Sequence, residues 1–262
     1  MRRRVTFLLA LLMVAASLGV VLTKSRRGAA SLDRSLDGSQ DGRQQAAGAA
    51  ESSPGQSHAH AAMGGHMRMT TARAVQPGDE KHADELAQRA RAAVEKYKDY
   101  RAALGDGYQI LLPHVPQKMY HFNHAGYYAE AERRFNPEHP TSLLYERTAN
   151  DYRLIGVMYT AAAGLTEDEL DARIPLSVAA WHQHVNVCLP EGDPLQNLFG
   201  NGTRFGLEGS ISNEAECRRE GGRFYPRLFG WMVHLYPYES TTREMWSVER
   251  QMDDGGAAAH AH

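Results

Sequence analysis

The hydrophobic periodicity of this sequence is confined to about residues 79–250, which limits where a packed core can form. Residues 25–78 are mostly Ala, Gly, Ser, Gln and Asp and show no apolar repeat. Such a composition buries too little apolar surface to offset the entropy lost on folding. We therefore predict a disordered linker over residues 25–78, a single globular domain over 79–250 and a disordered, histidine-containing tail over 251–262.

The first residues have the features of an export signal. Basic residues 2–4 precede an uncharged apolar run over residues 5–23, which is ~19 residues long against the ~20 that span a bilayer. Residues 1–24 are therefore predicted to be either a cleaved signal peptide or a signal-anchor, and both alternatives stay open. In either case the rest of the chain is expected to be extracytoplasmic, periplasmic or secreted, and an uncleaved signal would anchor it to the inner membrane.

The charge balance argues against one class of partner. The chain has 29 Lys+Arg against 31 Asp+Glu and a formal net charge of -2. Because a nucleic-acid-binding surface normally carries clustered positive charge, no nucleic-acid partner is expected. The sequence does not identify a protein partner.

Residues 79–250 combine one long helical pattern with short strand patterns. Over residues 79–104 apolar side chains recur every three or four residues, which predicts one helix packed on a sheet. Short helices are predicted at 165–173, after a capping box, and at 212–220, after a Ser N-cap. Strands are predicted at 110–112, 118–124, 142–147, 152–160, 180–189 and 229–237, with a hairpin turn at 148–151. The expected fold is α+β, a mostly antiparallel β-sheet or sandwich with the N-terminal helix packed on it and small helical insertions.

Histidines on the predicted strands suggest a metal site. On the strand over 180–189 a two-residue period places His182, His184 and Cys188 on one face. Three imidazoles hold zinc or copper and leave a coordination position open. The predicted ligands are His182, His184 and His234 together with His121. His124 and Glu146 are held in reserve.

A second group of potential ligands lies near the end of the predicted linker. The sequence HAHAAMGGHMRM mixes imidazoles, which suit Cu(II) and zinc, with thioethers, which suit Cu(I). This tract is predicted to be an accessory metal-collecting segment, and compositional drift in a linker is the competing interpretation. Its potential ligands are His58, His60, Met63, His66, Met67 and Met69.

Cys188 and Cys217 are the only cysteines. Outside the cytosol two lone cysteines usually pair, so a disulfide between them is predicted. The alternative is that Cys188, on the histidine face of its strand, is a thiolate copper ligand.

The motifs of the globular region occur in a characteristic order. They include WHQHVNVC at 181–188, EC at 216–217, GGRF at 221–224 and FGWMVH at 229–234. In this order the chain resembles a family of uncharacterised secreted bacterial proteins over about residues 79–250. The resemblance implies export and a common fold, and it carries no assigned activity.

The favoured function is therefore an extracytoplasmic metal-binding protein with a role in metal handling, for which copper is preferred and zinc is the alternative. Two other hypotheses stay open. The same histidines would suit a metal-dependent enzyme that activates water or oxygen at the open position. Alternatively, the chain is a metal-free structural or interaction domain whose strand histidines only satisfy hydrogen bonds.

Overall fold

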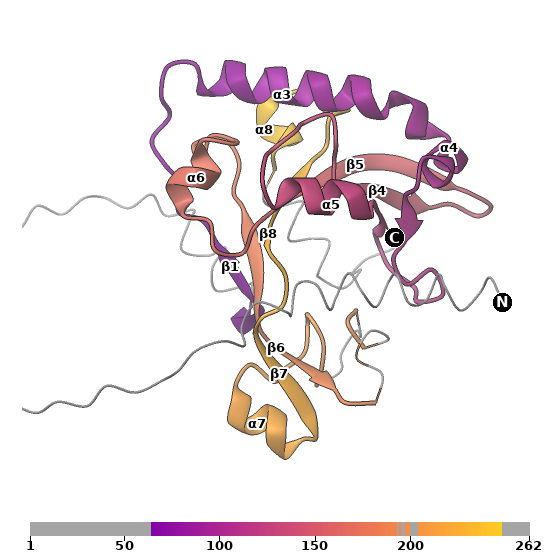
Figure 1. The fold of residues 1–262 in the computed structure, drawn as a ribbon, viewed down its shortest axis with the longest axis vertical. Coiled ribbons are helices and arrows are strands. Elements are labelled where there is room, and N and C mark those ends of the chain that lie inside the picture. The colour runs from indigo at the N-terminus through magenta and orange to yellow at the C-terminus, as the bar shows by residue number, and fades with distance from the viewer. Residues whose placement is uncertain (1–63, 193, 195–196, 200–203, 248–262) are drawn as a thin grey trace, which may run out of the picture. The chain divides into compact units, whose positions relative to one another are not determined.

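A computed structural model describes residues 64–192, 194, 197–199 and 204–247. Within them the chain forms an eight-stranded antiparallel sheet in the order β1-β6-β8-β5-β4-β3-β2, with β7 paired to β6 (Figure 1). The predicted α+β fold, with its mostly antiparallel sheet, is confirmed. The strands are β1 (Met67–Met69), β2 (Gln109–Ile110), β3 (Tyr120–Asn123), β4 (Ser142–Arg147), β5 (Tyr152–Ala161), β6 (His182–Pro190), β7 (Gly222–Arg227) and β8 (Trp231–Leu235).

The helix α3 (Asp79–Val94) covers one face of the sheet, as predicted (Figure 1). Its buried residues, among them Leu86 and Val94, belong to the same hydrophobic core as Trp231 and Val233 of β8. The predicted helix over 79–104 is interrupted, since η2 (Glu95–Lys98) and α4 (Tyr100–Gly105) follow α3. The interruption lies at Asp99, which is extended and whose side chain accepts a hydrogen bond from the backbone N of Arg101. Asp99 thus starts a new helix instead of continuing the old one.

Four further short α-helices lie in the described part of the fold: α5 (Ala125–Ala131), α6 (Glu167–Asp171), α7 (Glu214–Arg219) and α8 (Thr242–Met245). The predicted capping box of α6 is present, with Thr166 and Glu169 exchanging hydrogen bonds. The predicted N-cap of α7 was wrong by one residue, because the Asn213 side chain, and not that of Ser212, accepts from the backbone N of Glu216. The sequence analysis did not predict α5 or α8.

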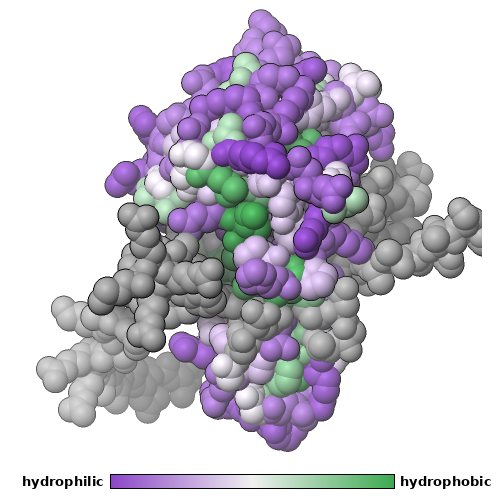
Figure 2. All heavy atoms as spheres, turned by 90° about the vertical axis from the view of Figure 1, so that its right-hand side faces the viewer, coloured by the Kyte–Doolittle hydropathy of each residue, from purple (hydrophilic) through white to green (hydrophobic). Residues whose placement is uncertain are grey.

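The sheet has hydrophobic side chains on both faces. On the face covered by α3, Leu143 and Tyr145 of β4 join the main core. On the opposite face, which we call the distal face, Leu144 packs with Met158 of β5 and Met232 of β8. The predicted hairpin of β4 and β5 is present, and the backbone N of Thr148 donates to the carbonyl O of Asp151 across its turn. From the side shown in Figure 2 the surface is largely hydrophilic, with a hydrophobic band near the middle of the view.

The sheet begins earlier in the chain than the sequence analysis predicted. Met67, Arg68 and Met69 form β1, which pairs with β6 and lies next to its histidines. The boundary placed at residue 79 was therefore too late, and residues 67–69 are part of the sheet and not of a linker. A three-residue strand is too short to give a periodic signal, and this strand is fixed by its long-range pairing with β6. The rest of the predicted linker before residue 64, and the predicted tail, lie outside the described residues.

Strand β6 changes partners along its length. Its first residues pair with β1 and β8, whereas Val185 and residues 187–190 pair with β7. Asn186, at the change, has a positive φ of 55°, and its side-chain Nδ2 donates to the carbonyl O of Gly65. This conformation, which asparagine tolerates better than most residues, ends the simple alternation predicted for the strand.

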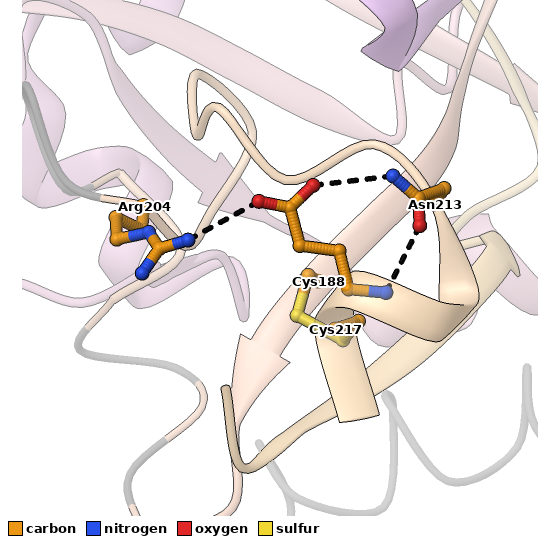
Figure 3. The surroundings of a disulfide bond; sticks show 5 residues. Cys188, Arg204, Asn213 and Cys217 are labelled. Carbon is orange, nitrogen blue, oxygen red and sulfur yellow. Dashed lines mark hydrogen bonds and ion pairs between the residues drawn. A yellow bond between two sulfur atoms is a disulfide. The ribbon is translucent and has the colours of Figure 1, made fainter. Parts of the chain in front are cut away.

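The predicted disulfide joins Cys188 of β6 to Cys217 of α7 (Figure 3). Both sulfur atoms lie in a small buried cluster with Ile211. Gly222 packs so tightly here that a Cβ on it would lie 2.6 Å from the Cys188 sulfur. The alternative assignment of Cys188 as a thiolate copper ligand is therefore wrong, because its sulfur is bonded to Cys217.

The disulfide closes a loop with a sequence separation of 29 residues. In the chain-entropy model such a loop contributes about 3–4 kcal/mol. We expect the double variant C188A/C217A to lose about this much free energy of unfolding, measured by urea denaturation with the full chain. Dithiothreitol should destabilise the wild type and leave the double variant unchanged; equal stability of the two oxidised proteins would contradict a stabilising bridge.

Candidate functional site

The four histidines predicted as ligands lie on the distal face of the sheet. Trp231 and Val233 of β8 are in the main core, so His234 next to them points to the other side. By the same alternation Trp181 enters the main core and His182 faces away from it. His182 and His234 are buried, at 3% and 4% exposure, whereas His121 and His184 are partly buried.

The imidazole rings form a continuous row. The ring centroids of His121 and His234 are 6.0 Å apart, those of His234 and His182 are 5.3 Å apart, and those of His182 and His184 are 5.7 Å apart. The row thus joins residues of β3, β8 and β6 that are far apart in the sequence. The central geometric prediction, that these side chains become neighbours on one face, agrees with these distances.

His121 and His234 approach each other although β5 and β4 lie between their strands. In a flat sheet β3 and β8 would be roughly 14 Å apart. The sheet therefore curls toward the distal face, and the two side chains lean across it. Gly156 of β5 permits the close packing of β8 and Tyr236 against this strand, because a Cβ there would lie 2.8 Å from the carbonyl O of Leu235 and 2.9 Å from the ring of Tyr236.

A fifth histidine, His66, lies next to this row. It belongs to η1 (Gly64–His66), is only 6% exposed, and its Nε2 lies 2.6 Å from the carbonyl O of Gly209. Since a carbonyl only accepts, Nε2 of His66 is the donor in this contact. Nδ1 of His66 is buried and has no hydrogen-bond partner among the described residues, and the same is true of Nδ1 of His184. The sequence analysis assigned His66 to the accessory tract and did not place it beside His184.

Burial favours the neutral form of His184. Burial, followed by the proximity of His234 and His66, lowers the pKa of His184 to about 4. A buried imidazolium is disfavoured both by desolvation and by neighbouring positive charge. At neutral pH His184 is therefore uncharged, the form in which imidazole binds a metal ion.

The arrangement falls short of a formed metal centre. Within the described part of the chain no three His, Cys, Asp or Glu side chains are grouped so that they could hold one metal ion. Two imidazoles that share a tetrahedral metal have ring centroids about 5 Å apart, given metal–nitrogen distances of about 2.0–2.1 Å. The spacing of His182 and His234 fits this value, and their rings are nearly perpendicular, at 89°. Because no three such side chains are grouped among the described residues, ligation of one ion by three of these histidines would require their side chains to rearrange.

The other predicted ligands are not part of this cluster. His124 caps α5, since its Nδ1 accepts from the backbone N of Tyr127 at 3.2 Å and its Nε2 donates to the carbonyl O of Asp106 at 3.2 Å. Glu146 forms an ion pair with Arg153. Both reserve residues are thus engaged in structural contacts. The accessory residues His58, His60 and Met63 lie outside the described residues, whereas Met67 and Met69 are in β1.

No protein-family model, curated protein or solved structure matches this chain. The resemblance to a family of secreted bacterial proteins therefore stays a prediction. None of the helices in the described part of the chain is long and apolar enough to cross a membrane. The apolar run at residues 5–23 lies outside that part.

The role of His124 as an N-cap can be tested separately from metal binding. We expect His124→Ala to lower the free energy of unfolding by about 0.5–2 kcal/mol, whereas His124→Asn, which keeps an acceptor, should lose much less. Neither variant should change metal binding, because both nitrogens of His124 are already engaged. Chemical denaturation and metal titration of the same samples check both statements; a large loss of metal from either variant would place His124 in the site.

The same cap predicts a pH dependence. Burial is the main cause that lowers the pKa of His124 below its ordinary value of 6.5. The folded state therefore favours neutral His124, and its stabilising contribution is complete above about pH 6.5 and is lost as the pH falls below that value. Denaturation curves between pH 7 and pH 5 should show a smaller loss of stability for His124→Asn than for the wild type, and parallel losses would contradict this assignment.

Proposed function

We propose that this chain is an extracytoplasmic metal-binding protein with a role in metal handling, copper being favoured and zinc possible as the bound ion. The observation that carries the proposal is the row of four imidazoles on the distal face, with successive centroids 5.3–6.0 Å apart. A single buried histidine is commonly structural. Four in contact, drawn from three strands, form a concentration of nitrogen ligands that hydrogen bonding alone does not require.

The chemistry of the row supports this choice of ions. Neutral imidazole is a good ligand for both copper and zinc. His182 and His234 are buried, and burial in apolar surroundings strengthens the interaction between a ligand and a cation by excluding water. His66 and His184 add two buried Nδ1 atoms, to which no described residue hydrogen-bonds, at one end of the row.

Two features support the proposed extracytoplasmic location. The N-terminal run at residues 5–23 has the character of an export signal, cleaved or retained as an anchor in the inner membrane. The Cys188–Cys217 disulfide suits an oxidising compartment such as the periplasm. An exported chain with this cluster would meet metal ions before they enter the cytosol, which suits capture or delivery.

The proposal is tested by metal binding to the full chain, purified without a nickel column. To remove potential ligands outside the described residues, His58, His60, His260 and His262 are replaced by Ala in a background variant. We expect about one copper ion per chain to resist desalting, measured by mass spectrometry of the metal. His182→Ala and His234→Ala should each lower the affinity at least about tenfold, since even the outer partners of metal ligands contribute 10–100-fold.

His82→Ala is the matched control, because His82 is exposed on α3, away from the distal face. It should bind metal like the background variant. Failure of the background variant to bind copper or zinc after loading would support the metal-free structural domain. Stoichiometric metal together with turnover of water or oxygen would support the metal-dependent enzyme.

A further inference from the structure

Strand β1 brings methionines next to the histidine row. In the pairing of β1 with β6, Met69 is the partner of His182 and Met67 is the partner of His184. On the other side of β6, His182 is also the partner of Met232 of β8. Met69, His182 and Met232 therefore form one row across three neighbouring strands, with an imidazole between two thioethers.

The direction of these side chains follows from the pairing. Cross-strand partners lie on the same face of a sheet, with Cβ atoms about 4.5–5.5 Å apart. Met67 and Met69 therefore share the distal face with their histidine partners. Arg68, between them, lies on the other face, where its guanidinium is 5.2 Å from the ring centroid of Trp231, a residue of the main core.

Burial separates these methionines from ordinary core residues. Met232 is buried, at 6% exposure, and packs with Met158 and Leu144. Met67 and Met69 are only partly buried, although Met69 stands beside the buried His182. A methionine that served only as filler would gain most from complete burial. Met67 and Met69 instead keep part of their surface exposed beside His184 and His182.

Ligand softness then distinguishes the metals. Thioether sulfur is a soft ligand that favours Cu(I), whereas zinc sites in proteins use thiolate, imidazole and carboxylate. A mixed set of two thioethers and one imidazole thus discriminates in favour of Cu(I) over zinc. A site made of the histidines alone would not discriminate in this way.

We infer that Met69, His182 and Met232 form a Cu(I)-selective site on the distal face, with Met67 and His184 as an adjoining pair of ligands. This inference rests on the proposed metal-binding function and specifies the oxidation state of its ion. It also unites two features of the sequence, because the end of the His/Met tract and the strand histidines contribute to one site.

The test compares Cu(I) and zinc binding to the background variant that lacks His58, His60, His260 and His262. Cu(I) affinity is measured by competition with a chromophoric chelator in the presence of ascorbate, and zinc affinity by a parallel competition. The double variant M69L/M232L conserves side-chain volume and removes both thioethers. We expect its Cu(I) affinity to fall at least about tenfold, with zinc affinity changed by less than about twofold.

Two controls keep the outcome interpretable. Met245→Leu alters a methionine of α8 that packs against the main core, and it should bind Cu(I) like the background variant. Thermal unfolding of the metal-free proteins shows whether M69L/M232L is folded; if it is not, Met69→Leu alone, at a partly exposed position, provides the comparison. With selenomethionine protein, X-ray absorption should detect selenium bound to copper, and this signal should be absent from the double variant.

The outcomes separate this inference from the proposed function. If the background variant binds neither Cu(I) nor zinc, the proposed function fails. If Cu(I) is bound and lost in His182→Ala, but M69L/M232L binds it with unchanged affinity and no selenium signal appears, the function stands and the thioether site is overturned. Parallel losses of Cu(I) and zinc affinity in a folded M69L/M232L would also overturn it, because selectivity would not depend on the sulfur atoms.

Discussion

The opposite directions of successive side chains in a pleated strand determine which residues of this domain enter the core and which lie on the distal face. In β8 the alternation gives Trp231 and Val233 to the core beneath α3 and leaves Met232 and His234 on the distal face. The same rule operates in β6 and β3, so one sheet has an ordinary hydrophobic face and a face with histidines and methionines. The curl of the sheet adds His121 of β3 to this group, whereas His182 and His234 are close because β6 and β8 are neighbouring strands.

Much of the fold follows from local sequence patterns. The hairpin of β4 and β5 and the capping box of α6 are encoded by residues close in the chain, and both were predictable. The strands that were missed, β1 and β7, depend on distant partners. Residues 67–69 become a strand only because β6 is available to pair with them, and β7 likewise pairs with the second half of β6. The break at Asp99 was missed because a capping side chain competes with an otherwise continuous helical pattern.

For the candidate site, the sequence could predict which histidines share one face of the sheet, but not how their rings are oriented. Alternation along β6 and β8 was enough to place His182, His184 and His234 on one face. It could not predict the ring orientations, in which the His182 ring is nearly perpendicular to the rings of His184 and His234. Nor could it place His66, because that position depends on the contact between its Nε2 and the carbonyl of Gly209, far along the chain. A search for Met and His at alternate positions near the start of the domain would have drawn attention to β1.

The pairing of β1 with β6 also bears on self-association. A chain shortened to begin at residue 79, the boundary suggested by composition, would lack β1 and leave backbone N–H and C=O groups of His182 to His184 unpaired along one side of β6. Exposed strand edges of this kind recruit strands from other molecules. Residues 67–69 therefore cover this edge of β6 and hinder its pairing with strands of other molecules. A shortened form of the domain that does not self-associate must include them.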